Sequence, residues 1–203
     1  MPTTHLLYLH GFRSSPLSTK AKMMAAIVQQ QYPSVTWWCP QLPPSPSQAM
    51  RQVLEKISSW PSSERFDSMA VVGSSLGGFY ATWVTETMGC KAVLLNPAVD
   101  PARDLLGHTG EQTVWQNPAD RFVFKTEYVA ELRQFETGSL AQPNQYLTLV
   151  AKGDEVLNWR EMAGRYEKTQ LHVLEGGDHA LSSFDLHLPL ILDFLNLDQR
   201  GVR

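Results

Sequence analysis

The sequence predicts an α/β fold: a mostly parallel six-stranded sheet with helices on both faces and a small lid inserted at about residues 100–143. The first observation is a series of short apolar runs, each as long as a strand that is buried on both faces. The second is that stretches of helical periodicity separate these runs, which is typical of parallel sheets. The third is that polar, turn-forming segments follow several of the runs, where folds of this class build their sites.

In the first half of the chain, strands and helices alternate. A strand is expected at Leu6–His10, and the helix after it has an apolar face at helical spacing. A second helix is expected to have Ser45 as its cap and Pro46 at its first position. The elements expected in this half are, in order, Leu6–His10, Ser18–Gln31, Val35–Cys39, the helix from Pro46, Met69–Val72 and the helix Tyr80–Met88, which Gly89 ends.

The second half resumes the alternation after a long irregular region. Between Asp100 and Pro143 the only clear helical pattern is Thr126–Gln134, and connections of this length inside a compact domain are usually lids or functional insertions. The other elements expected in this half are the strands Lys91–Leu95, Tyr146–Val150 and Gln170–Leu174 and the helices Asn158–Tyr166 and Leu186–Leu195.

Size and composition favour a single domain over residues 1–203. The chain has 43% hydrophobic residues, which is enough for one core, and its net charge of -3 is scattered, which argues against a nucleic-acid partner. Neither a signal peptide nor a membrane-spanning run is visible, so we expect a cytoplasmic protein, a monomer or a weak homo-oligomer. Cys39 and Cys90 are expected as buried, reduced thiols, and no metal or cofactor motif is apparent.

Residues Gly73 to Gly77 form the pattern G-x-S-x-G between an apolar strand and a helix. Glycines on either side of Ser75 allow strand and helix to bend sharply toward each other, so the serine is expected on a strained, exposed turn. This is the pattern of a nucleophile elbow. Taken alone it could also be a glycine-rich loop, so the interpretation depends on partner residues elsewhere.

A serine nucleophile needs a base and an acid that orients the base. His179 is the best candidate for the base, because it follows the last strand next to paired glycines. The acid is expected after the preceding strand, where Asp154 and Glu155 both stand, and Gly153 before and Val156 after favour Asp154. Asp100 remains a rival acid.

The order Ser75, Asp154, His179 is that of α/β hydrolases. The chain also resembles the YqiA-type bacterial esterases of the α/β-hydrolase superfamily, from near residue 5 to near residue 197 and least at 100–143. The matching motifs are Leu7–Phe12, Pro40–Pro44, Val72–Gly78, Asn96–Ala98, Gly153–Leu157 and Gly176–Ala180. The resemblance implies a trimmed hydrolase sheet and the triad Ser75, Asp154 and His179.

Acyl transfer also needs donors for the developing negative charge, and the backbone N–H groups of Phe12 and Leu76 are the candidates. Arg13 is a candidate for binding a substrate carboxylate or phosphate, although an arginine there is more often a solvated or ion-paired loop residue. Aromatic residues of the insertion are candidates for an acyl pocket or for a small core of their own: Trp115, Phe122, Phe124 and Tyr128.

These features predict a serine hydrolase, without cofactor or metal, that cleaves a small-molecule acyl ester or thioester, acyl-CoA among them, through an acyl group on Ser75. Cleavage of amide or carbon–carbon bonds by the same residues is an alternative, because the elbow does not specify the leaving group. A further alternative is a binding protein that has this fold and does not catalyse a reaction.

Overall fold

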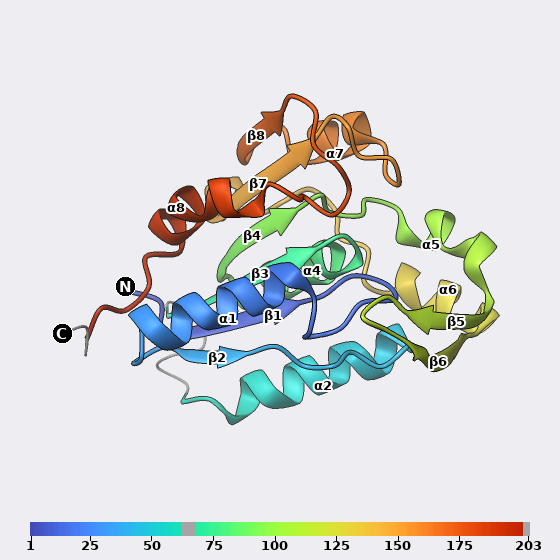
Figure 1. The fold of residues 1–203 in the computed structure, drawn as a ribbon, viewed down its shortest axis with the longest axis horizontal. Coiled ribbons are helices and arrows are strands. Elements are labelled where there is room, and N and C mark those ends of the chain that lie inside the picture. Colours follow the sequence, from blue (N-terminus) through green and yellow to red (C-terminus); the bar gives the residue numbers. More distant parts are fainter. Residues whose placement is uncertain (62–67, 201–203) are drawn as a thin grey trace.

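The structure is a computed structural model that describes residues 1–61 and 68–200 (Figure 1). Within this part of the chain, six strands form a parallel sheet in the order β2-β1-β3-β4-β7-β8, which confirms the predicted sheet. The strands are β1 (His5–Leu9), β2 (Thr36–Trp38), β3 (Met69–Ser74), β4 (Lys91–Leu95), β7 (Tyr146–Ala151) and β8 (Gln170–Leu174).

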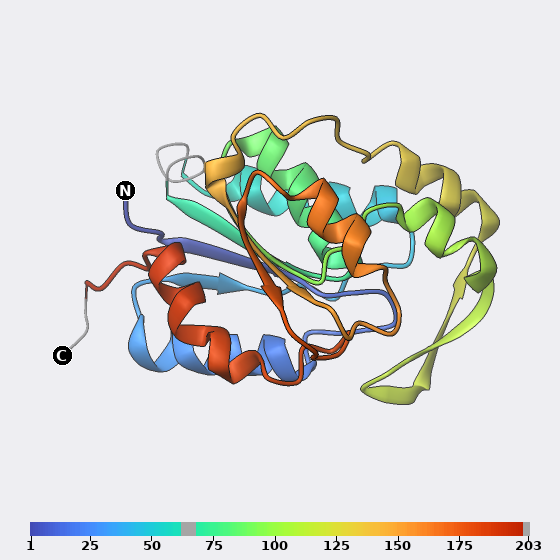
Figure 2. The same cartoon turned by 90° about the horizontal axis from the view of Figure 1, so that it is seen from above.

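Helices cover both faces of the sheet, as predicted (Figure 2). Successive side chains of β1 alternate between two hydrophobic clusters, because neighbouring residues of a strand point to opposite faces. Leu6 and Tyr8 pack with α1 (Thr19–Gln31) and α8 (Phe184–Leu195), and Leu7 and Leu9 pack in the cluster of the other face. The helices of that other face are α2 (Pro46–Ser59), α4 (Leu76–Met88) and α7 (Trp159–Arg165).

Of two helix starts that the sequence predicts, one agrees with the structure and the other differs from it. Pro46 is the first residue of α2, and the Ser45 hydroxyl accepts a hydrogen bond from the Gln48 N–H at 3.2 Å, as the sequence predicts. The helix α4 begins at Leu76, before the predicted start at Tyr80. Glycine disfavours helices, but here Gly77 has no room for a side chain, so close packing decides the conformation instead of propensity.

The insertion has more regular structure than the sequence predicts. It contains α5 (Pro101–Asp104), η1 (Leu106–His108), the antiparallel strands β5 (Gly110–Val114) and β6 (Asn117–Phe124), the helix α6 (Thr126–Arg133) and η2 (Pro143–Gln145). The helix matches the predicted Thr126–Gln134, whereas the β5–β6 hairpin was not predicted. Most of its residues are exposed on both faces, so they lack the apolar alternation that indicates a strand.

The strand order reverses between β1 and β3, because β2 lies on one side of β1 and β3 on the other. At such a point the loops after the two strands diverge and leave a crevice, which is where ligands bind in open parallel sheets. The β5–β6 hairpin lies beyond this carboxyl edge of the sheet (Figure 1). In the described part of the chain no helix is both long enough and apolar enough to cross a membrane.

Candidate active site

Ser75 lies between β3 and α4 in a backbone conformation that side chains rarely adopt, with φ +56° and ψ -121°. Two glycines make this turn possible. A Cβ on Gly73 would lie 2.2 Å from the Gly77 oxygen, and a Cβ on Gly77 would lie 1.9 Å from the Leu9 oxygen. Strand β3, helix α4 and the end of β1 are therefore in contact here, and the tight turn presents the Ser75 side chain at the crevice.

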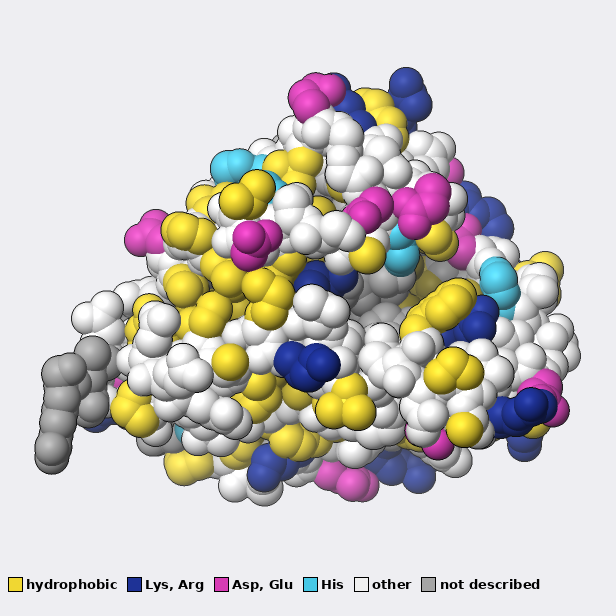
Figure 3. All heavy atoms as spheres, in the orientation of Figure 1, with side chains coloured by type: hydrophobic (Ala, Val, Ile, Leu, Met, Phe, Trp, Pro, Cys, Tyr) yellow, Lys and Arg dark blue, Asp and Glu magenta, His cyan; other side chains and the backbone are white. Residues whose placement is uncertain are grey.

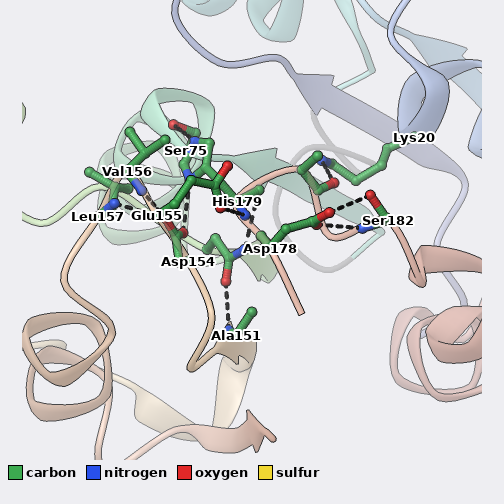
Figure 4. Close-up of polar contacts among 12 residues, drawn as sticks. Lys20, Ser75, Ala151, Asp154, Glu155, Val156, Leu157, Asp178, His179 and Ser182 are labelled. Atoms are coloured by element: carbon green, nitrogen blue, oxygen red, sulfur yellow. Dashed lines mark hydrogen bonds and ion pairs between the residues drawn. The ribbon is translucent and has the colours of Figure 1, made fainter. Parts of the chain in front are cut away.

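His179 lies between Ser75 and Asp154 and makes a hydrogen bond to each (Figure 4). His179 Nε2 is 3.0 Å from Ser75 Oγ, and His179 Nδ1 is 2.7 Å from Asp154 Oδ2. The three residues come from the loops after β3, β7 and β8. The arrangement can move a proton from the serine to the imidazole while the carboxylate holds the ring.

The loop after β7 fixes the Asp154 carboxylate. Its Oδ1 accepts hydrogen bonds from the Val156 and Leu157 N–H groups at 2.8 and 2.7 Å, and the side chain is 0% exposed. Oδ2 is thereby directed at His179. Glu155 has a different contact, because its Oε2 accepts from the backbone N–H of His179 at 2.9 Å. The two adjacent acids thus hold the ring and the backbone of the same histidine.

The other acids weighed from the sequence make different contacts. Asp100 caps α5 by accepting a hydrogen bond from the Arg103 N–H at 3.1 Å. Asp178 binds the hydroxyl and the N–H of Ser182, and these hydrogen bonds lower its pKa. Asp178 therefore stabilises the turn after His179, and its carboxylate does not bind the imidazole.

Asn96 connects the loops of the acid and the base. Its side-chain amide donates to the carbonyls of Asp178 and His179 at 3.0 and 3.2 Å, and its Oδ1 accepts from the Ala151 N–H at 2.8 Å. The residue is 1% exposed, so these bonds satisfy a buried amide. From the sequence Asn96 stands out only as part of the motif Asn96–Ala98, although its place directly after β4 is a signal that could have singled it out.

Lys20 contacts the loop that carries His179. From α1 its ammonium group donates a hydrogen bond to the Ala180 carbonyl, directly after His179 (Figure 4). Burial lowers the pKa of Lys20 to about 8, while the negative charges of Asp178 and Asp154 act to raise it. Nothing in the pattern of α1 distinguishes Lys20 from Lys22, so sequence reasoning missed this contact.

The loop after β1 packs directly against the serine. A Cβ on Gly11 would lie 3.1 Å from the Ser75 Cβ, so only glycine fits without a shift. Within the described residues, no backbone hydrogen bond uses the N–H of Phe12 or of Leu76. Both predicted donors are therefore available to a ligand.

The side chain of His10 helps to hold the loop after β1 in place. The Leu42 N–H donates to its Nε2 at 3.1 Å, so the ring proton lies on Nδ1, which donates to the Gly11 carbonyl at 3.0 Å. Burial lowers the pKa of His10, and the backbone hydrogen bond opposes this in part. A neutral His10 thus joins the loop after β1 to the loop at residues 40–44.

Arg13 binds the β5–β6 hairpin. Its Nε and Nη2 donate to the carbonyl and hydroxyl oxygens of Thr113, both at 2.9 Å, and its guanidinium carbon lies 3.9 Å from the centre of the Trp115 ring. The Trp115 N–H in turn donates to the Arg13 carbonyl at 2.7 Å. Arg13 has φ +57°, so its backbone, like that of Ser75, has an uncommon conformation.

Three of the four aromatic candidates of the insertion pack together with Phe12. The Phe12 ring meets Phe122 and Phe124 edge to face, at 5.9 and 5.1 Å between ring centres, and Phe124 meets Tyr128 at 5.7 Å. Phe124 is 1% exposed and belongs to the core. Phe12 and Phe122 also line a cavity, whereas Trp115 is largely exposed and stacks against Arg13.

That cavity has a volume of about 940 Å³ and opens between the loop after β1, the loop at residues 40–44 and the hairpin. Leu76 and Tyr80 of α4 form part of its wall, together with Gln52 of α2. Figure 3 shows that the molecular surface is hollowed between the hairpin and the sheet. A ligand at Ser75 therefore has space on the side of Phe12 and Leu76.

Comparisons with known proteins agree with this architecture. The model of an uncharacterised protein family, UPF0227, matches residues 5–196. Mouse alpha/beta hydrolase domain-containing protein 10 superposes with a TM-score of 0.68 at 14% identity, over 94% of this chain and 88% of that one.

Two further solved structures resemble this chain. Est1E from Butyrivibrio proteoclasticus, solved with ferulic acid bound, has a TM-score of 0.68 at 14% identity, over 96% of this chain and 87% of its own. Paleococcus ferrophilus monoacylglycerol lipase has a TM-score of 0.65 at 13% identity, over 96% and 95% of the two chains. The fold is that of the α/β hydrolases.

Proposed function

Because this chain belongs to the uncharacterised protein family UPF0227 and has the α/β-hydrolase fold, we propose that it is a serine hydrolase of carboxylic esters or thioesters. The observation that carries the proposal is the chain of hydrogen bonds from Ser75 through His179 to Asp154. The names of its structural neighbours, among them a lipase, are consistent with it.

In the first half of the reaction His179 takes the proton of the Ser75 hydroxyl while Oγ forms a bond to the acyl carbon. Asp154 accepts from Nδ1–H, so Nε2 is free to receive this proton. The oxygen of the tetrahedral intermediate accepts hydrogen bonds from the Phe12 and Leu76 N–H groups. When the intermediate collapses, the bond to the leaving group breaks and His179 gives that group its proton.

In the second half water replaces the leaving group. His179 removes a proton from a water molecule as its oxygen attacks the acyl carbon, and then returns the proton to Ser75 Oγ as the acid is released. The same groups act in both halves. The backbone bonds of His179 to Glu155 and Asn96 keep the ring in place for each transfer.

The proposal predicts that Ser75→Ala and His179→Ala each lower kcat on 4-nitrophenyl acetate, the acetate ester used in the tests below, by about 10⁴–10⁶. Ser75 should also be the residue that a fluorophosphonate probe labels, which mass spectrometry of the labelled peptide checks. Folding of each variant is verified by circular dichroism. Near-normal turnover by either folded variant would refute the mechanism.

The neighbouring acids provide a matched control. Asp154→Asn should lower kcat by about 10⁴, because an amide favours the wrong tautomer of the imidazole. Glu155→Gln should lower kcat by less than about tenfold, because its carbonyl oxygen still accepts from the His179 N–H and a neutral hydrogen bond is worth about 1 kcal/mol. The reverse ranking would assign the acid to Glu155.

A further inference from the structure

The cavity reaches Ser75 through Gly11 and Leu76, which both line it and lie next to the serine. The leaving group must face His179, because it receives its proton from Nε2. Among the described residues, the cavity is lined by Phe12 and Leu76 and by none from the loops that carry Asp154 and His179. If the proposed function holds, the acyl portion of the substrate points into this cavity.

Two groups on the cavity wall have hydrogen-bonding capacity that the protein does not use. Tyr80 is 3% exposed, and no hydrogen bond among the described residues involves its hydroxyl. The Gln52 carboxamide, from α2, is likewise without a hydrogen-bond partner in this part of the chain. Buried polar groups are nearly always hydrogen-bonded, so a phenol left open on a cavity wall indicates a ligand.

The charges around Tyr80 restrict what that ligand group can be. Burial raises the pKa of Tyr80, and the negative charge of Glu131 raises it further, so the phenol stays neutral and can donate. Glu131 is held by the Ser45 hydroxyl and the Ser47 N–H, at 2.6 and 2.9 Å. A second carboxylate bound at Tyr80 would be repelled by Glu131, whereas a neutral hydroxyl or amide would not.

The wall also has an apolar part, with Leu42, Leu76 and Phe122 among its residues, whereas the charged residues that line it, Arg13, Asp120 and Arg121, come from the loop after β1 and from the hairpin. A volume of about 940 Å³ lies within the range of roughly 300–1,000 Å³ that is usual for ligand pockets. Beside Leu76, the residue after Ser75, the cavity thus combines apolar side chains with the polar, uncharged groups of Tyr80 and Gln52, which come from α4 and α2.

We propose that this cavity binds the acyl group of the substrate and selects acyl groups that have an apolar body and a neutral hydroxyl or amide, which Tyr80 and Gln52 bind. The inference rests on the proposed hydrolase function and deepens it. It assigns Tyr80 and Gln52 as specificity residues that do not touch the reacting atoms.

The test compares 4-nitrophenyl esters in matched pairs that differ only by a hydroxyl in place of a methyl group. One pair is 3-(4-hydroxyphenyl)propanoate and 3-(4-methylphenyl)propanoate, and the other is 8-hydroxyoctanoate and nonanoate. In at least one pair kcat/KM should be about tenfold higher for the hydroxyl ester. Tyr80→Phe, which removes one oxygen, should lower this ratio by about the same factor, and Gln52→Leu should lower it as well.

Tyr32→Phe is the matched control, because Tyr32 follows α1 and does not line the cavity, so the ratio should keep its wild-type value. A ratio at or below one in both pairs, failure to hydrolyse either pair, or a ratio that Tyr80→Phe leaves unchanged would overturn the inference.

Hydrolysis of the acetate ester and labelling of Ser75 separate the two proposals. If both persist, only the acyl selectivity has failed; if both are lost, the hydrolase function has failed.

Discussion

At the scale of single residues, Asn96 is a group that does not contact Ser75 or the His179 ring and yet holds the loops of the proposed acid and base. Its backbone N–H donates to the Leu149 carbonyl, and its side chain binds both the end of β7 and the backbone of His179. Its φ is +42°, a region that residues other than glycine adopt only when the surroundings hold them there. One amide therefore fixes the distance between the acid and base loops.

We expect Asn96→Asp to lower kcat by about 10–100-fold, because a carboxylate loses both donors to the Asp178 and His179 carbonyls. Steady-state kinetics on the acetate ester, well below the Tm of the variant, measures this. KM should change little, since Asn96 does not reach the substrate.

A double-mutant cycle separates positioning from general destabilisation. If Asn96 acts through His179, Asn96→Asp should have almost no further effect in the His179→Ala background. Additive losses in that background would show that Asn96 only supports the fold.

At the scale of elements, the loop after β1 and the β5–β6 hairpin form one unit. Arg13 and Trp115 exchange backbone and side-chain contacts, and the Ser15 hydroxyl donates to Gln116 Oε1 at 3.0 Å. Phe12, whose N–H is the proposed oxyanion donor, directly precedes Arg13. The hairpin therefore stabilises the backbone that carries this proposed donor.

Arg13→Ala is expected to lower kcat/KM on a neutral ester by about tenfold, because it removes two hydrogen bonds and the stacking on Trp115. Limited proteolysis should then cleave the hairpin at residues 110–124 faster than in the wild type. Wild-type values in both measurements would show that Arg13 does not hold the hairpin.

Thr113→Val is the matched control for Arg13, since it removes the hydroxyl partner and keeps the carbonyl, so its effect should be smaller. The same variants test the interpretation that Arg13 binds a substrate anion. In that case Arg13→Ala would raise KM for a carboxylate-bearing ester far more than for a neutral one.

At the scale of the whole molecule, the stability of the fold should depend on Lys20 at alkaline pH. Its pKa is about 8 in the folded chain and 10.5 for an ordinary lysine, so between these values the unfolded chain binds more protons. The contribution of Lys20 to the free energy of unfolding therefore becomes more favourable to the folded state as pH rises from about 8 to 10.5.

In Lys20→Met this contribution is absent, and the wild type should gain stability relative to the variant as pH rises through that window. Urea unfolding of both proteins at several pH values from about 7.5 to 10 measures the difference between their free energies of unfolding. Cys39 and Cys90, whose pKa values burial raises to about 12, are present in both proteins and cancel. Parallel curves would show that Lys20 titrates normally.

The sequence predicted the sheet, the covering helices and the positions after the strand ends because these depend on local patterns. Apolar runs, a cap at Ser45 and the glycines around Ser75 are each visible within a few residues. The contacts of Asn96 join residues 55 to 83 positions apart, so no local pattern indicates them. The β5–β6 hairpin lacks a buried face, and its docking on Arg13 was invisible for the same reason.

The strand next to the base lies at the border of the sheet. Among the residues that the structure describes, β8 pairs only with β7 and is partly exposed, whereas β3, which leads to Ser75, is wholly buried. Border strands fray before central ones. Gentle heating should therefore abolish hydrolytic activity while most of the core is still folded, and cooling should restore that activity. Loss of activity and global unfolding would then be separate events.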